Sequence, residues 1–186
     1  MVVGAMADIS PMELQGFYNI GAMGGKRFQN QPEKSCRPFD KDHEGFIYGQ
    51  SAGCLILESA ESVIRRHAIA HAEILGGVLL LDGNRLSDSN EEGETRVMQA
   101  ALKYSNNNID QVDYINTHGS SSPLGDKVEL KAIRNVFQDD VSRIWLNSTK
   151  SLTGHCLYSA GIIETIASVL QIRIMELFNL KKILDL

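Results

Sequence analysis

Two histidines and a lysine are the residues of this chain whose types and surroundings best suit catalysis. His118 lies in residues 116–126 (NTHGSSSPLGD), and His155 ends residues 148–155 (STKSLTGH), in which Lys150 comes five positions earlier. Imidazole N–H groups are good donors to an oxygen that gains negative charge, and a nearby ammonium disfavours the protonated imidazole. Two imidazoles and an ammonium on one rim would therefore form an electrophilic pocket.

The elements around these motifs explain how they would meet. Each motif follows a hydrophobic, strand-like run, at residues 112–115 (VDYI) and 143–146 (RIWL), and each precedes a helix-like stretch. Loops that follow neighbouring strands lie at the same edge of a sheet, where functional residues are commonly held. The sequence thus predicts that the two motifs face each other at one sheet edge.

Strands and helices alternate along the rest of the chain. The patterns predict strands at residues 1–6, 47–58, 71–80, 112–116 and 143–148, and helices at residues 11–20, 59–70, 94–105, 126–137 and 159–173. Strands that alternate with helices of about 10 to 15 residues are typical of an α/β layered fold with a mixed sheet.

Composition narrows the class of protein. The 186 residues carry a net charge of −5 with scattered Lys and Arg, which indicates no nucleic-acid surface. No apolar run approaches the roughly 20 residues that span a bilayer, so we expect no membrane segment and a cytoplasmic location. Three cysteines at positions 36, 54 and 156 show neither paired nor metal-ligand spacing, which favours free thiols.

Three linked motifs carry a resemblance to a known family. They are residues 38–53 (PFDKDHEGFIYGQSAG), the His118 motif and the motif from Lys150 to His155, in that order. Together they resemble the C-terminal half of the β-ketoacyl carrier-protein synthases, which are condensing enzymes of fatty-acid and polyketide synthesis. The resemblance runs from about Val2 to Arg173. It implies a thiolase-like fold of five α/β/α/β/α layers built from two related halves.

The resemblance also divides the chain. Residues 1–70 would be the end of the N-terminal ketosynthase half, residues 71–173 a truncated C-terminal half, and residues 174–186 a divergent tail. In the family the acyl-accepting nucleophile lies on a turn upstream of a segment that resembles residues 1–6, and no such turn precedes residue 1. We therefore expect half an enzyme with exposed sheet edge and core, which needs the missing N-terminal half or a homodimer partner.

Roles for the candidate residues follow from the family. His118 and His155 would donate to the thioester oxygen of a malonyl substrate during decarboxylation. Lys150 would act by orientation and electrostatics and pair with Glu129 on the helix after the His118 motif, although Glu129 is equally typical of a solvated helix surface. Asp126 would support the same loop.

Further contacts concern the substrate carrier. Ser120 and Ser122 occupy positions where the family carries hydroxyls that bind the phosphopantetheine arm of an acyl carrier protein, although Ser before Pro is also ordinary turn composition. We expect no other cofactor and no metal. His67 and His71 are spaced i, i+4 but lack the Glu of a metalloprotease helix.

Two departures from the elongating synthases point to a subgroup. Elongating synthases usually read RDGF and GEGAG, where this chain has HEGF from His43 and GQSAG around Gln50. These departures resemble the decarboxylases of polyketide β-branching cassettes, which convert malonyl carrier protein to acetyl carrier protein. The alternatives are a decarboxylative condensing synthase of chain elongation, and a catalytically inactive fragment or structural half-partner.

Overall fold

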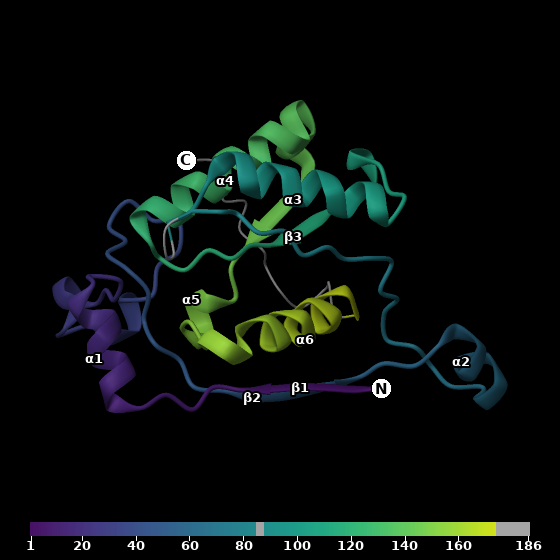
Figure 1. Ribbon diagram of the computed structural model, residues 1–186, viewed down its shortest axis with the longest axis horizontal. Helices are drawn as coiled ribbons and strands as arrows, with labels where there is room; N and C mark the ends of the chain where they lie inside the picture. The colour runs from purple at the N-terminus through teal and green to yellow at the C-terminus, as the bar shows by residue number, and fades with distance from the viewer. Residues whose placement is uncertain (85–87, 174–186) are drawn as a thin grey trace.

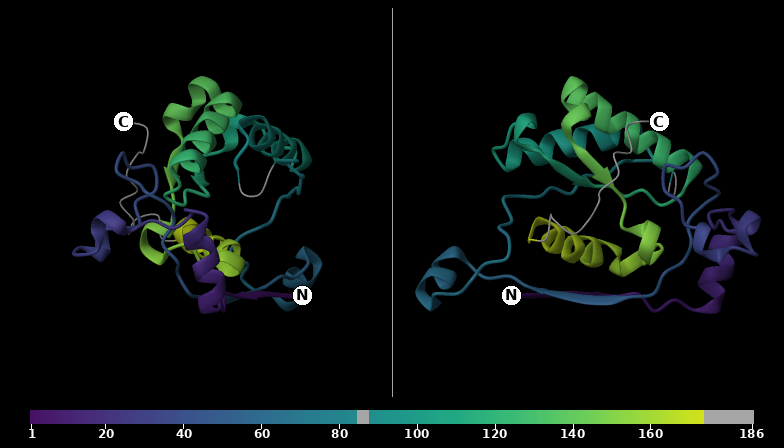
Figure 2. Two further views of the ribbon diagram at one scale, coloured as in Figure 1. Left: turned by 60° about the vertical axis from the view of Figure 1, so that its left-hand side comes forward. Right: turned by 180° about the vertical axis from the view of Figure 1, so that it is seen from behind.

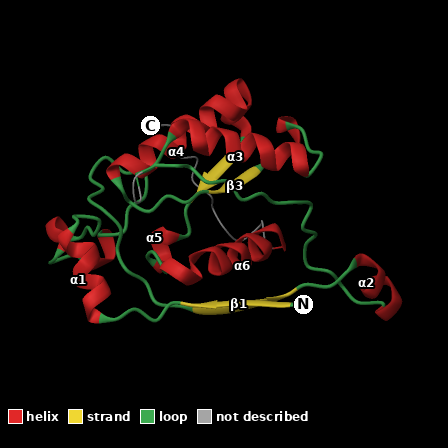
Figure 3. Cartoon of the chain, in the orientation of Figure 1, coloured by secondary structure: helices red, strands yellow, loops and turns green. Residues whose placement is uncertain are grey.

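The computed structural model describes residues 1–84 and 88–173 of the chain. Ten strands and helices are labelled in this part: β1 (Val2–Met6), α1 (Pro11–Asn19), β2 (Ala52–Ile56), α2 (Ala60–Arg66), α3 (Glu91–Tyr104), β3 (Tyr114–Asn116), α4 (Pro123–Phe137), β4 (Trp145–Asn147), α5 (Lys150–Thr153) and α6 (Ala160–Arg173). Short 3-10 turns and long loops connect them, as the colours of Figure 3 show. The predicted α/β class is confirmed.

The elements form layers around helix α6. Strands β1 and β2 pair antiparallel, and β3 and β4 pair parallel in a second small sheet. Helix α6 lies between the two sheets, with α3 and α4 on the outer side of the second (Figures 1 and 2). It contacts β2 on one side. On the other side the amide of Asn116 in β3 donates to the Glu164 carbonyl oxygen of α6 at 3.3 Å.

The apolar core fills the space between α3, α4 and the β3–β4 pair. Its buried members are Ile133, Val136, Phe137, Ile144 and Leu146. Helix α4 begins at Pro123, three residues earlier than expected, because the Ser122 side chain accepts a hydrogen bond from the Gly125 amide at 3.3 Å and Pro is favoured in the first helical turn. This core supports the strand ends from which the two histidine loops emerge.

The predicted strand at residues 71–80 is wrong. In the part of the chain that the structure describes, this stretch is assigned no strand, and apolar side chains such as Leu79 at 92 % and Ile74 at 65 % exposure face outward. A strand is stable only when a neighbour satisfies its backbone groups and covers its apolar face. The pattern of residues 71–80 fits a strand, but its backbone is not paired into either small sheet.

The surface is large for the mass of the chain. The accessible area is 12583 Å² at 20.5 kDa, whereas a compact protein of this mass exposes about 8,900 Å². Residues 85–87 and 174–186 are outside the described ranges, and an extended residue exposes about 160 Å². Subtracting this area for all of them removes only about 2,600 Å² of the excess. Among the described residues, no helix has the length and hydropathy needed to cross a membrane.

Candidate active site

The two histidine loops leave neighbouring strands at the same edge. Strands β3 and β4 pair in register, with Asn116 opposite Asn147, and the chain stays paired one residue further, where the Thr117 amide donates to the Asn147 carbonyl at 2.8 Å. The imidazoles of His118 and His155 then meet edge to face, with centroids 5.2 Å apart and planes at 80°. The structure thus brings together the two histidines that the sequence singled out.

His155 is fixed by a segment far away in the sequence. Its amide donates to the Ile47 carbonyl at 2.7 Å, and its carbonyl accepts from the Gly49 amide at 3.1 Å. Gly154 precedes it at φ +69°, and a Cβ there would lie 2.9 Å from the Ile47 carbonyl oxygen. Only glycine fits both this conformation and this close approach. The ring of Phe46 packs edge to face on the His155 ring at 5.3 Å.

A backbone hydrogen bond sets the tautomer of His155. Its Nδ1 accepts from the Leu157 amide at 3.1 Å. In a neutral imidazole one nitrogen accepts and the other carries the hydrogen, so Nε2 is the donor here. Burial, followed by the charges of Lys150 and His118, lowers the pKa of His155 to about 4. At neutral pH His155 is therefore a neutral N–H donor.

The second imidazole has the same charge state. Protein atoms crowd the His118 ring, and this burial, followed by the positive charge of Lys150, lowers its pKa to about 4, although the residue keeps an accessible face. The ring is therefore uncharged at neutral pH and open to a molecule that approaches from solvent. Two neutral imidazoles side by side suit an oxygen that becomes negative, because each offers one N–H without giving up a proton.

Lys150 lies beneath the pair and is 1 % exposed. Its Nζ donates to the His118 carbonyl oxygen at 2.6 Å and forms an ion pair with Glu164 of α6. A buried ammonium needs such partners, because an isolated charge in the interior is strongly unfavourable. The ammonium thus holds the His118 carbonyl and pairs with Glu164.

Glu129 makes different contacts from those expected. Its carboxylate accepts the His118 amide at 2.6 Å and the Gly119 amide at 2.8 Å, so the ion pair of Lys150 is with Glu164 instead. The predicted Lys150–Glu129 pairing is wrong because Glu129 already has two backbone donors. Burial raises the pKa of Glu129, and the two amides oppose this rise. Glu129 and Lys150 therefore grip the amide and the carbonyl of the same residue.

The remaining candidates lie in the same loop. Asp126 is 2 % exposed, and its Oδ1 accepts the Ser120 amide at 3.0 Å. Ser120 is buried, whereas Ser122 caps α4, as its turn composition allowed. The Ser148 hydroxyl donates to the Gly119 carbonyl at 2.6 Å and so joins the two histidine loops.

Sequence reasoning missed three partners of the site. Glu164 is the only acidic residue in α6, and a single carboxylate in a mostly apolar helix is a signal that could have found it. The Cys36 thiol donates to the Lys150 carbonyl oxygen at 2.8 Å, and His43 binds Asp126. No local spacing connects these last two residues to the loop, because about 80 or more residues separate them from their partners.

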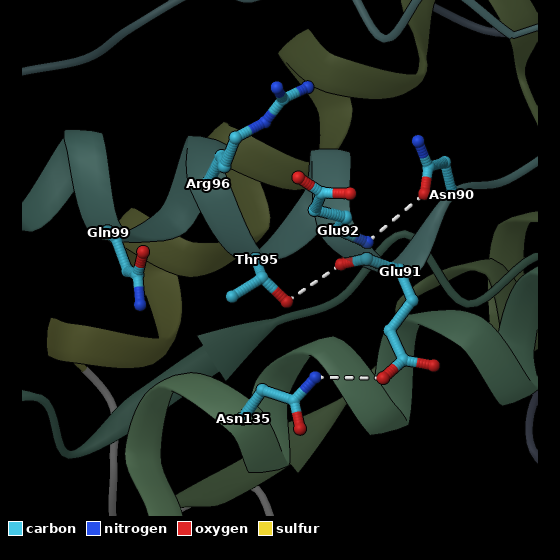
Figure 4. Close-up of a pocket in the computed structure, with 7 residues that line it drawn as sticks. All are labelled: Asn90, Glu91, Glu92, Thr95, Arg96, Gln99 and Asn135. Atoms are coloured by element: carbon cyan, nitrogen blue, oxygen red, sulfur yellow. Dashed lines mark hydrogen bonds between the residues drawn. The ribbon is translucent and has the colours of Figure 1, made fainter.

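A pocket of about 440 Å³ lies elsewhere, between α3 and α4. Figure 4 shows its lining residues, among them Glu91 bonded to Asn135 and Thr95 bonded to the backbone of Glu91. These polar groups satisfy one another on the outer helices. Neither His118 nor His155 lines this pocket.

Comparison with known proteins decides the family. Residues 71–179 match the C-terminal domain of beta-ketoacyl synthases, and residues 1–62 match the N-terminal domain. The chain belongs to the β-ketoacyl synthase family. The three motifs from which the sequence analysis drew its resemblance are thus confirmed as ketosynthase motifs, and the layered arrangement around α6 is part of the thiolase-like ketosynthase fold.

Individual ketosynthases refine this picture. The chain is 43 % identical over 173 residues to the polyketide biosynthesis malonyl-ACP decarboxylase PksF of Bacillus subtilis. This match covers 93 % of the chain and 41 % of that relative. It is 38 % identical over 176 residues to the 3-oxoacyl-acyl-carrier-protein synthase 2 of Coxiella burnetii, with 93 % and 42 % covered. The chain thus spans about two-fifths of these relatives.

A solved structure agrees with the sequence comparison. It is a type II polyketide ketosynthase in complex with its acyl-carrier protein, matched with a TM-score of 0.85 and 32 % identity. The match covers 92 % of this chain and 43 % of that one. The described part of the chain therefore has the backbone arrangement of a ketosynthase, although it makes up less than half of one.

Proposed function

We propose that His118 and His155 stabilise the enolate formed when a malonyl group on a carrier protein loses carbon dioxide. The observation that carries this proposal is the pair of neutral imidazoles 5.2 Å apart, of which His155 is fixed as an Nε2–H donor. Donors that are already in place where charge develops cost no reorganisation during the reaction, and the loss of one typically costs about 10²–10³ in rate.

The chemistry balances without a metal or a redox group. The bond between the carboxylate carbon and the α-carbon breaks, carbon dioxide leaves, and the electron pair moves into the thioester as an enolate. The enolate oxygen accepts one hydrogen bond from the N–H group of each imidazole. A proton from solvent on the α-carbon gives the acetyl thioester. Attack of the same carbon on the carbonyl of a second acyl thioester, whose C–S bond breaks to release a thiolate, would instead give a β-ketoacyl product.

Lys150 supports the donors from below. It holds the His118 carbonyl and its positive charge favours neutral imidazoles, so its part is positioning and electrostatics. Asp126 and Glu129 hold the amides of the same loop. Ser120 and Ser122 are proposed to contact the phosphopantetheine arm. The buried setting of Ser120 and the capping bond of Ser122 would hold both hydroxyls at the base of the loop.

The relatives favour decarboxylation over condensation. Identity is 43 % with the malonyl-ACP decarboxylase of Bacillus subtilis and 38 % with the 3-oxoacyl-acyl-carrier-protein synthase 2 of Coxiella burnetii. The departures at His43 and Gln50 point the same way. A condensing synthase remains the second candidate, because the His118, Lys150 and His155 set serves either reaction.

A chimera tests the proposal directly. Residues 1–173 would replace the matched segment of the Bacillus decarboxylase, and the purified chimera would receive malonyl carrier protein, with products followed by mass spectrometry. We expect acetyl carrier protein, lost on His118→Ala or His155→Ala and kept in the matched control His67→Ala, which changes an exposed histidine of the cap of α2. A β-ketoacyl product in the presence of an acyl donor would instead assign condensation.

The third candidate, an inactive half that needs a partner, concerns the same chain. The excess surface and the exposed side chains of residues 74–81 support an apolar interface with the remaining ketosynthase part or with a second copy. The 186-residue chain mixed with a separately made N-terminal half of the relative would bind it and release acetyl product if the chain is half an enzyme. Binding without any turnover would favour a structural half-partner.

A further inference from the structure

Asp126 connects the histidine loop to a distant segment of the chain. Its carboxylate is 2 % exposed and accepts three hydrogen bonds. Oδ1 accepts the Ser120 amide at 3.0 Å, and Oδ2 accepts the Phe39 amide at 2.7 Å and Nδ1 of His43 at 3.0 Å. Two of these donors are backbone groups, so His43 supplies the side-chain contact of this set. A buried carboxylate depends strongly on each such donor.

The His43 ring is held in one orientation by this contact. Its side chain is 17 % exposed. Because an ionised carboxylate only accepts hydrogen bonds, Nδ1 of His43 must carry the hydrogen, whether the ring is neutral or charged. The next residue, Glu44, accepts the Gly25 amide at 3.0 Å and the Arg27 amide at 3.2 Å. The segment around His43 is thus anchored on both sides.

The loop that Asp126 holds is tightly wound. Gly119 and Ser121 adopt φ values of +29° and +69° on either side of Ser120, and the second of these is unfavourable for a residue with a side chain. Such a backbone persists only where surrounding bonds hold it. The bonds at Ser120 to Asp126 and at Gly119 to Glu129 and Ser148 do so, and His118 directly precedes Gly119.

We propose that His43 is a positioning residue for His118, which acts through Asp126 by holding the carboxylate that fixes the Ser120 amide. The consequence for turnover rests on the proposed function, in which His118 is a donor to the substrate oxygen. Arg37 reinforces the same link, since its amide donates to the Ser121 hydroxyl at 2.7 Å. Lys150, Glu129 and Cys36 are the other titratable groups in this cluster.

Amide exchange of the 186-residue chain tests the inference without turnover. We expect His43→Ala to raise the exchange rate of the Ser120 amide about tenfold or more and to shift the His118 Cε1–H resonance, because a hydrogen bond to a charged group is lost. His43→Asn places its amide nitrogen where Nδ1 was, so it should return both signals to within about threefold of the parent rate. His67→Asn, at an exposed histidine, should change neither.

A second pair of variants covers the case in which His43→Ala does not fold. His43→Gln keeps the polarity and a similar size, but its amide nitrogen reaches where Nε2 was, so we expect fast Ser120 exchange in His43→Gln and slow exchange in His43→Asn. Equal exchange in these two variants would overturn the proposal, as would an unchanged Ser120 amide in a folded His43→Ala. Fast Ser120 exchange in His43→Ala together with full activity of the same variant in the chimera would support the contact through Asp126. It would overturn the donor role of His118.

Discussion

The histidine loops and the β1–β2 side of the chain differ in how much of their structure is completed by the chain itself. Around the loops, Lys150, Thr117 and Ser121 are at most 1 % exposed. The Lys150 ammonium and the Asp126 and Glu129 carboxylates each have hydrogen-bond partners within the chain. On the β1–β2 side and along residues 74–81, Val2, Ile56 and Leu81 are 69 %, 80 % and 91 % exposed. The histidine loops are thus packed and hydrogen-bonded within the chain, whereas the β1–β2 side and residues 74–81 leave large apolar side chains exposed.

This difference reflects the geometric requirements of polar and apolar contacts. A buried polar network is stable only when nearly every member is satisfied, so the site must be built within one contiguous set of contacts. Apolar surface can be buried later against a partner, because the free energy of its burial is roughly proportional to area and depends little on geometry. Figure 1 shows this division: helices α3, α4 and α6 enclose the β3–β4 pair, whereas the chain around α2 extends away from it.

The largest effect should come from the ion pair under the loops. Lys150→Met removes the ammonium and leaves Glu164, whose side chain is 20 % exposed, without its partner. The free energy of unfolding, measured with urea, should fall by about 3 to 5 kcal/mol, because breaking a buried pair from one side leaves an uncompensated charge. Lys127→Met, at an exposed position of α4, is the control. Equal losses in the two variants would mean that the buried pair contributes nothing.

A pair of apolar truncations compares the two regions directly. Ile133 is 1 % exposed in the core between α4 and the β3–β4 pair, whereas Leu79 is 92 % exposed. Ile133→Ala should lower the free energy of unfolding by about 3 kcal/mol, since it removes buried methyl groups and leaves a cavity. Leu79→Ala should change it by less than about 0.5 kcal/mol.

The same two residues can show whether residues 74–81 form an interface. When the chain is bound to the N-terminal half of the relative, Leu79→Ala should weaken the complex while Ile133→Ala acts through folding alone. If Leu79→Ala left binding unchanged, residues 74–81 would not be part of the interface. The exposed apolar side chains of β1 and β2 would then be the remaining candidates for it.

The sequence predicted the site better than the scaffold. His118, His155 and Lys150 were found because each belongs to a local motif that follows a strand, and locally coded loops keep their relation to the strand they follow. The strand at residues 71–80 failed because its hydrophobic pattern is local but strand pairing is not. Glu164, Cys36 and His43 were missed for a related reason: they meet the loops only through the fold.

The last comparison concerns acid. The pKa values of His118 and His155 are lowered to about 4 in the folded chain, against about 6.5 in an unfolded one. Between these values the unfolded state binds more protons, so the stability that the two rings contribute is fully present above about pH 6.5 and is lost as the pH falls toward 4. Glu94, whose pKa burial and Glu129 raise to about 7, acts in the opposite direction over part of this window.

A difference between variants separates the two effects. His155→Asn removes one of the titrating rings and leaves Glu94 in place, so the thermal midpoint of the variant should fall less than that of the parent between pH 6.5 and 4.5. His67→Asn, which changes an exposed ring, should follow the parent. Parallel curves for the parent and His155→Asn would mean that His155 is not held neutral by the site. The proposed function requires both rings to donate hydrogen bonds as neutral imidazoles, so that outcome would also contradict the role assigned to His155.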